Sequence, residues 1–309
     1  MEFITAGFEI IEQQPGLEGI FKAIELPGRI CYGSQDKITA DSAKKFCDML
    51  MISKHSGVLE HGTVYLKIRY YDIEGMRLMT FFTVNPYSKV KTDNEFMYIT
   101  TNLRVLFEND LMPLLDKYLC EPTEMHEQRV CVRFTIDRFT GEEFLRHRVA
   151  SFNRESTRYV LFTKEKFGGG SIKYIIPVWM LDKQDVIQSY NHYDISEFCR
   201  DVIDIESGDL DCMYDVFVWM FALKSCEWSY NKLVNDFDWK AEQARTVLPC
   251  AINSPLIKTA FTSDWVNFFN LRAIGTTGRP HPQALELAEP LMNEFIERGY
   301  LKREDMVIK

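Results

Sequence analysis

Hydrophobic and polar positions in the first half of the chain predict helices and strands in succession. Residues 40–54 place Phe46 and Leu50 on the apolar side of a helix that Asp41 or Ser42 can cap. A helix is also expected from Gly141 onward. Apolar and polar positions alternate, as they do in half-buried strands, at residues 62–71 and 129–137, and a further short strand is expected at 172–179.

The second half of the chain is mainly helical by the same criteria. Residues 211–234 carry apolar side chains on most faces of a helix and are expected to be largely buried. Further helices are expected at 238–249, where Pro249 ends the helix, at 264–272, and at 282–299, with proline first and glycine last. Residues 85–94 have turn character, residues 108–119 suggest a short helix broken by Pro113, and Gly168, Gly169 and Gly170 suggest a turn. An antiparallel strand layer with long helices predicts an α+β fold, with residues 1–309 as a single domain.

Composition narrows the classes of function. The 309 residues include 36 Lys and Arg against 45 Asp and Glu, a net charge of −9, which argues against broad nucleic-acid binding. No apolar run is long enough to cross a bilayer, and the acidic N-terminal residues do not resemble a secretion signal. The eight cysteines occur singly, without a C-x-x-C pair. A cytoplasmic protein with reduced thiols and no structural metal site is therefore expected.

The segment LRHRVASFNRESTRYV, residues 145–160, concentrates four arginines in this acidic chain. Guanidinium groups bind phosphate in bidentate fashion and stay charged, and the segment adds neutral donors such as Ser151 and Asn153. The pattern favours a nucleotide or dinucleotide ligand, with His147 pointing away from Arg146 and Arg148. The alternative is a solvated helix face paired with Glu142 or Glu143. No P-loop or G-x-G-x-x-G motif is present, so a dinucleotide would bind outside a Rossmann fold.

Four segments together resemble the flavin-dependent thymidylate synthase family. Arg146-His147-Arg148, seven further residues and then Ser156 resemble the family signature, which Arg158 and Tyr159 complete. HSGVLEH at 55–61 and ARTVLP at 244–249 resemble two more shared segments. Asn267 with residues 270–272, followed by His281-Pro282-Gln283, resembles the last one. The resemblance covers residues 25–71, 128–180 and 220–298.

The resemblance implies a homotetramer of α+β subunits with active sites at the subunit interfaces. It also implies FAD as cofactor, NADPH and methylenetetrahydrofolate as co-substrates, and conversion of dUMP to dTMP. The residues expected to contact the flavin are Arg146, His147, Arg148, His55, Glu60, Asn267 and His281. Those expected to hold dUMP are Ser156, Arg158 and Arg245, with Glu143 and Glu155 as further candidates and Arg272 against the uracil ring.

The residue types suit this chemistry. Carbon 5 of uracil is a weak nucleophile, so its activation leaves negative charge on the ring, which a fixed guanidinium such as Arg272 stabilises. Ser156 is a candidate nucleophile, but no His–Asp partner is evident in the sequence, which favours a hydrogen-bonding role. Simpler interpretations also exist, in which Arg245 forms a surface pair with Glu242 and His281 only begins a helix.

Several positions depart from the family pattern. Glu60 and Arg146 lie much further apart than in relatives, which predicts an insertion at about residues 72–127. Glu143 stands where relatives have Gln, and Arg154 is an unmatched charge. Phe261 and Ser263 stand where many relatives have Asn and Arg beside the flavin, and Gly57 replaces a hydroxyl residue.

Three functions follow from these observations. The first is a flavin-dependent thymidylate synthase. The second is a flavoenzyme of the same fold that modifies another pyrimidine nucleotide or adds a different one-carbon group, which Glu143 and Phe261 motivate. The third is a non-catalytic nucleotide-binding or assembly protein, motivated by the changes at Gly57, Phe261 and Ser263.

Overall fold

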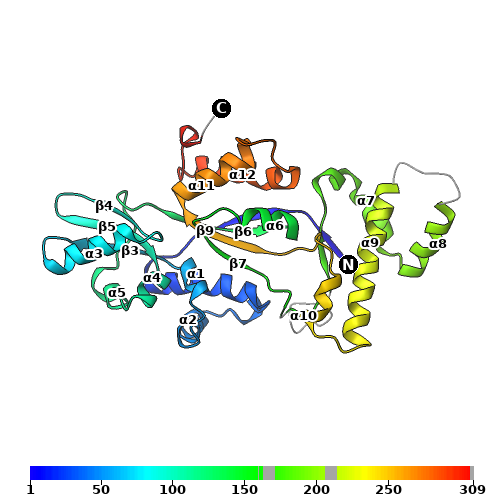
Figure 1. Cartoon of the computed structure of the whole chain (residues 1–309), viewed down its shortest axis with the longest axis horizontal. Helices are drawn as coiled ribbons and strands as arrows, with labels where there is room; N and C mark the ends of the chain where they lie inside the picture. The colour runs from blue at the N-terminus through cyan, green and yellow to red at the C-terminus, as the bar shows by residue number, and fades with distance from the viewer. Residues whose placement is uncertain (159, 163–170, 206–213, 307–309) are drawn as a thin grey trace.

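The computed structural model describes residues 1–158, 160–162, 171–205 and 214–306. Tyr159 and the predicted turn at Gly168, Gly169 and Gly170 lie outside these residues. Figure 1 shows an elongated molecule with a sheet and its covering helices at the centre, a second sheet at one end and a group of helices at the other. The expected α+β class is confirmed.

The central sheet is antiparallel, with strand order β2-β6-β9-β7. Its strands are β2 (Gly7–Ile11), β6 (Arg129–Thr135), β9 (Leu256–Phe261) and β7 (Ser151–Arg154). Helices α11 (Thr262–Phe269) and α12 (Pro282–Glu297) lie on one side, and α1 (Gly16–Cys31) and α2 (Ser42–Ile52) on the other (Figure 1). All six residues of β9 are buried, because helices cover both of its faces.

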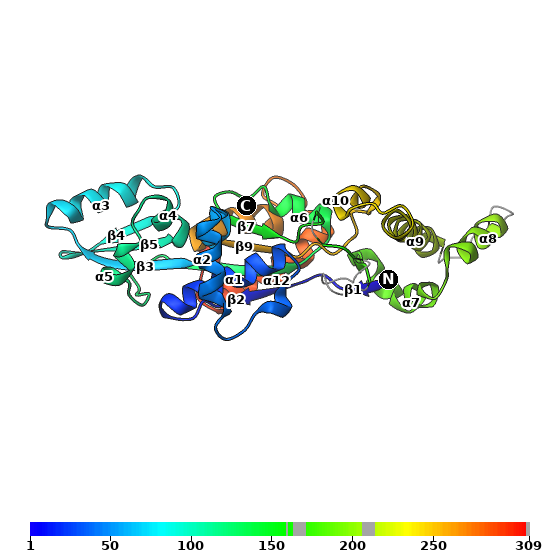
Figure 2. The same cartoon turned by 90° about the horizontal axis from the view of Figure 1, so that it is seen from below.

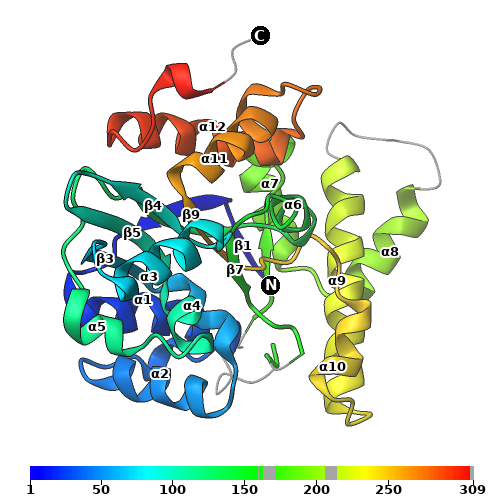
Figure 3. The same cartoon turned by 60° about the vertical axis from the view of Figure 1, so that its left-hand side comes forward.

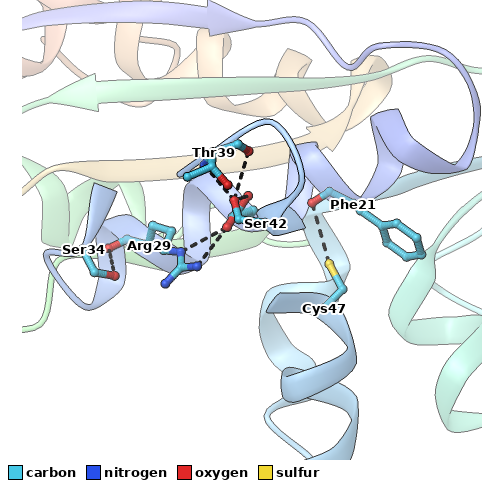
Figure 4. A network of polar contacts seen from close by, with 7 residues as sticks. Phe21, Arg29, Ser34, Thr39, Ser42 and Cys47 are labelled. Atoms are coloured by element: carbon cyan, nitrogen blue, oxygen red, sulfur yellow. Dashed lines mark hydrogen bonds and ion pairs between the residues drawn. The ribbon is translucent and has the colours of Figure 1, made fainter. Parts of the chain in front are cut away.

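A buried carboxylate ties α1 to the loop that leads into α2. Glu25 is 2% exposed and accepts hydrogen bonds from Arg29, at 3.0 Å, and from the Ser42 hydroxyl, at 2.8 Å. Figure 4 shows Arg29 and Ser42 facing each other, with Thr39 bound to Ser42. The predicted cap residue Asp41 precedes α2 but makes no capping bond with its side chain. The start of α2 is therefore held by a tertiary contact and not by a local cap.

The segment 72–127 is folded and extends strand β3 (Thr63–Arg69) into a second antiparallel sheet, ordered β3-β5-β4. It contains α3 (Ile73–Val84), β4 (Lys89–Thr92), β5 (Phe96–Asn102), α4 (Leu103–Glu108) and α5 (Pro113–Tyr118). The turn predicted at 85–94 is therefore partly wrong, since β4 pairs with β5 there. Pro113 begins α5 and does not break it, because a first-turn proline needs no helical N–H partner.

The other end of the molecule holds α7 (Gln184–Asn191), α8 (Ile195–Ile205) and α9 (Tyr214–Asn235), which lie together in Figures 2 and 3. Strands β1 (Glu2–Ile4) and β8 (Lys173–Ile175) form a short parallel pair beside them. The expectation that α9 is largely buried is wrong for one face, where Val218 and Trp228 are 46% and 50% exposed.

Most other predicted elements are confirmed, with changes at their ends. Helix α6 (Arg138–Phe144) begins before Gly141, because Asp137 caps it by accepting from the Thr140 N–H at 3.0 Å. The helix predicted at 238–249 divides into α10 (Ala241–Ala244) and a 3-10 turn, Arg245–Val247. Helix α11 continues into a π-helical turn, Asn270–Ile274. Across the described ranges, no helix combines the length and apolarity that crossing a membrane requires.

Candidate active site

A cavity of 730 Å³ opens where α6, the π-helical turn and the start of α12 meet. Its lining includes four predicted site residues, namely Glu143, Arg146, Arg272 and His281. Its volume lies within the range of pockets that bind small ligands. The fold brings these residues together because β6 leads into α6, while β9 leads into α11, which returns across the sheet to the same end.

Arg272 is held by three hydrogen bonds within the cavity wall. Its Nη1 pairs with the carboxylate of Glu143, and its Nη2 donates to the carbonyl oxygen of Glu143 at 3.3 Å. Its Nε donates to Nε2 of His147 at 3.0 Å. The Arg272 side chain is 19% exposed, so it is fixed in orientation and still reachable from the cavity. It lies in the π-helical turn, a helix distortion that is frequent at functional sites.

His147 lies behind Arg272 and is neutral. Since its Nε2 accepts a hydrogen bond, the ring proton is on Nδ1, for which the described residues offer no acceptor. Burial, together with the nearby Lys258 and Arg272, lowers the pKa of His147 to about 3. The ring of Phe268 contacts it edge-on, with centroids 5.1 Å apart. His147 therefore supports Arg272 without adding charge.

Lys258 is fully buried beneath the same wall. Its Nζ lies 3.9 Å from the ring centroid of Trp265 and 4.3 Å from that of Phe268. Burial places the pKa of Lys258 well below its ordinary value, and no hydrogen-bond partner for Nζ occurs in the part of the chain that the structure describes. The sequence gives no signal for this residue, because one lysine in an apolar strand looks like an edge position.

Arg146 and Arg148 are exposed, whereas His147 between them is buried, as the sequence predicts. Arg146 lines the cavity and can reach an anion within it. Arg148 is outside the lining residues. Asn267 is exposed on α11, and the ring of His281 lies 6.0 Å from that of Trp179 at the cavity wall.

The segment 55–61, whose His55 and Glu60 are predicted to lie near the flavin, packs against the 72–127 segment. Glu60 pairs with Arg104 of α4 at 2.5 Å, and Arg104 also binds Glu108 at 2.8 Å. The hydroxyl of Ser56 donates to Glu108 at 2.6 Å. His55 is exposed at the start of the 3-10 turn Ser56–His61. These residues do not line the 730 Å³ cavity of the same chain.

The two altered positions beside the expected flavin also contact residues 72–127. Phe261 is 3% exposed, and Nζ of Lys89 lies 5.6 Å from its ring centroid. The hydroxyl and the N–H of Ser263 both donate to Oε1 of Glu127, at 2.5 and 3.1 Å. Neither position offers a free side-chain donor to a ligand, because Phe261 is apolar and the Ser263 hydroxyl donates its proton to Glu127.

The residues expected to hold dUMP form a third group. Arg158 pairs with Glu242 at 3.1 Å, and its N–H donates to the hydroxyl of Ser156 at 3.3 Å. Arg245 is exposed on the neighbouring 3-10 turn, and Glu242 pairs with Arg158 and not with Arg245. Burial raises the pKa of Glu155 to about 7, although Lys173 and Arg133 oppose the shift. One chain therefore does not gather all the predicted residues into one cavity.

Within the described ranges, no three His, Cys, Asp or Glu side chains are grouped as metal ligands.

Sequence reasoning missed Phe139 and Trp179, whose rings line the cavity and are 68% and 53% exposed. Single aromatic residues in a sequence give no sign of where they point, and only the meeting of α6 with the 3-10 turn Val178–Lys183 reveals them.

Solved structures resemble this chain only remotely. The UMP/dUMP methylase PolB from Streptomyces cacaoi, bound with 5-Br dUMP, is 16% identical with a TM-score of 0.38, over 96% of this chain and 93% of that one. Thymidylate Synthase X from Helicobacter pylori, solved with FAD and dUMP, is 13% identical with a TM-score of 0.41, over 98% of this chain and all of that one. No curated protein matched the sequence.

The family model described as "Thymidylate synthase complementing protein" matches residues 120–298. The match includes the arginine-rich segment, Arg245, Arg272 and His281, whereas the segment at 55–61 lies outside it and its assignment stays a prediction. Because the match spans more than half of the 309 residues, the chain belongs to the thymidylate synthase complementing protein family.

Proposed function

We propose that this protein is a flavin-dependent thymidylate synthase that converts dUMP to dTMP, with methylenetetrahydrofolate as carbon donor and NADPH as reductant. The observation that carries the proposal is the placement of Arg272, which faces a ligand-sized cavity together with Arg146. The separation of Ser156, Arg158 and Arg245 from this cavity supports a homotetramer in which neighbouring subunits complete each site. A cytoplasmic location is part of the same proposal.

Arg272 suits the activation of carbon 5. Electron density must be pushed toward this carbon before it attacks the one-carbon unit, which places negative charge on the oxygens and N3 of the activated uracil ring, and a positioned guanidinium stabilises that charge as it develops. The hydrogen bonds to Glu143 and His147 fix the guanidinium before the substrate arrives, so little reorganisation is needed. The carboxylate of Glu143 also reduces the net positive charge beside the uracil ring, which weakens the stabilisation of negative charge on that ring.

The cavity residues fit a flavin in part. Arg146 offers an exposed guanidinium to a phosphate, and the cavity has room for a flavin or pyrimidine ring. When bound, the reduced flavin supplies the hydride that completes the methyl group. Positions 261 and 263 contribute no free donor, because Phe261 is apolar and the Ser263 hydroxyl binds Glu127. FAD binding therefore depends on Arg146 and on residues other than this pair.

Glu143 favours a second candidate, a flavoenzyme of the same fold that acts on a cytosine nucleotide. A carboxylate accepts the hydrogen bond that the N4 amino group of cytosine donates. Arg272 and Glu143 place a donor and an acceptor side by side, which can complement cytosine as well as uracil. The choice between the two bases is therefore made by titrating dUMP and dCMP against the same protein.

The test begins with the visible absorption spectrum of purified protein, mixed with FAD and then desalted. Retained flavin whose band shifts with dUMP, and dTMP formed from dUMP, methylenetetrahydrofolate and NADPH, is the expected result. A shift and product with dCMP alone would favour the second candidate. Absence of retained flavin with either nucleotide would leave the non-catalytic nucleotide-binding function and overturn the proposal.

A further inference from the structure

Two large aromatic side chains stand exposed inside the candidate active site. Phe139 is 68% exposed and Trp179 is 53% exposed, and both line the 730 Å³ cavity. The family signature segments include neither residue. Aromatic rings usually contribute to a core by burying their faces, so exposed rings in a concave, charged site indicate a surface that a ligand covers.

Both rings are presented by rigid local structure. Phe139 lies in the first turn of α6, where Asp137 caps the helix and also accepts from Gln283 of α12 at 3.1 Å. Trp179 lies in the 3-10 turn that follows Pro177, and its neighbour Met180 is buried in the helical end of the molecule. A ring held by a fixed backbone loses little conformational freedom when a ligand stacks on it.

The charges around the rings define the class of ligand. Arg146 and Arg272 line the same cavity and can bind an anionic group, whereas Phe139 and Trp179 offer flat apolar faces. This combination suits a planar heteroaromatic ring that carries a phosphate, since aromatic faces stack on bases of any sequence.

We infer that Phe139 and Trp179 form an aromatic wall that stacks on the heteroaromatic ring of a phosphorylated ligand, the pyrimidine of dUMP or the ring system of the flavin. The inference rests on the proposed function and adds two specificity-determining residues to it. A second copy of this chain is the competing occupant of the wall. The concave shape and the two lining arginines favour the small ligand, because the core of a subunit interface is depleted in charge.

The experiment measures dissociation constants of the full chain for dUMP and for FAD, titrated separately by calorimetry. We expect Trp179→Ala and Phe139→Ala each to weaken one of the two ligands by about 5- to 100-fold. Trp179→Tyr, which keeps a ring, should restore most of the affinity. The ligand that weakens identifies which ring stacks on the wall.

The chain offers matched controls with nearly the same exposure outside the cavity. Trp228 on α9 is 50% exposed and Phe237 is 67% exposed. We expect Trp228→Ala and Phe237→Ala to leave both dissociation constants within about twofold, and circular dichroism confirms that each variant is folded. Wild-type protein that binds neither ligand refutes the proposed function. If Trp179→Ala and Phe139→Ala both bind dUMP and FAD as tightly as the wild type does, this inference is overturned, whether or not the oligomeric mass changes.

Discussion

Replacing Arg272 by alanine separates the chemical role of this residue from its structural role. The change removes a guanidinium that lines the cavity and binds both Glu143 and His147. Among the described residues, no other arginine does both. If this group stabilises charge on the uracil ring, turnover should fall by about 10²- to 10³-fold, the usual effect of losing one such donor. Binding of dUMP in the ground state should change much less, since the ring is then uncharged.

The structural cost is smaller. Glu143 is 31% exposed and can be rehydrated from the cavity once its partner is gone. The Nε2 atom of His147 is left buried without its donor, which costs about 1–3 kcal/mol. At about 2–4 °C per kcal/mol for a chain of roughly this size, the melting temperature should fall by about 2–12 °C. The variant should therefore be folded and almost inactive.

The assay is steady-state formation of dTMP under saturating co-substrates, with dUMP affinity measured in parallel. Arg279→Ala is the matched control, because Arg279 is an exposed arginine in the loop just after the π-helical turn. Arg272→Lys should fall between wild type and alanine, since lysine keeps the charge but not the planar fork. A folded Arg272→Ala variant with kcat within about threefold of wild type would refute the assignment of Arg272 to transition-state stabilisation.

Three further predictions test the surroundings of Arg272. On the proposed function the cavity accepts an anionic nucleotide, so Glu143→Gln, which removes one negative charge from it, should tighten dUMP binding about fivefold by calorimetry; weaker binding would make Glu143 a direct contact of the base. Lys258→Met replaces an amine that has no hydrogen-bond partner among the described residues, and should raise the free energy of unfolding in urea by about 1–3 kcal/mol, whereas a loss of stability would show that the amine is paired. Burial lowers the pKa of both His61 and His147 from 6.5 to about 3, so the unfolded chain binds more protons between these values, and the free energy of unfolding should fall as the pH drops below 6.5. Each histidine contributes a slope that approaches about 1.4 kcal/mol per pH unit. His147→Gln should remove the contribution of His147 to this slope. An unchanged slope in that variant would contradict a buried, neutral His147.

The fold was predictable where local pattern and tertiary packing agree. Strand β6 alternates as the sequence predicts, because one of its faces packs on α11 and α12 while the other is only half-buried. Helix α12 has its proline and glycine signals at both ends and is found there. Strand β4 was missed because its residues, KVKT, are short and polar, and only pairing with the well-buried β5 makes them a strand.

The site was predictable in its residue types but not in its partnerships. The resemblance names Glu143, Arg146, Arg272 and His281 as site residues, and these four residues line one cavity, although their roles stay predictions. It could not show that Glu143 is the counter-ion of Arg272, because these residues lie 129 positions apart and meet only through β6, β9 and the helices that follow them. The sequence also suggested that Phe261 and Ser263 only remove polar groups from the flavin site, because a single sequence does not show which residues surround a substituted position.

Phe261 and Ser263 share a neighbour in the structure. Glu60, Phe261 and Ser263 belong to different elements, yet each contacts the 72–127 segment, through Arg104, Lys89 and Glu127 respectively. An asparagine at 261 would leave a polar group in a position that is only 3% exposed, and the hydroxyl of Ser263 donates its proton to Glu127 of the segment. Phe261 and Ser263 therefore fit their packing against this segment, whereas two other departures, Glu143 and Arg154, pair with Arg272 and Glu142 outside it.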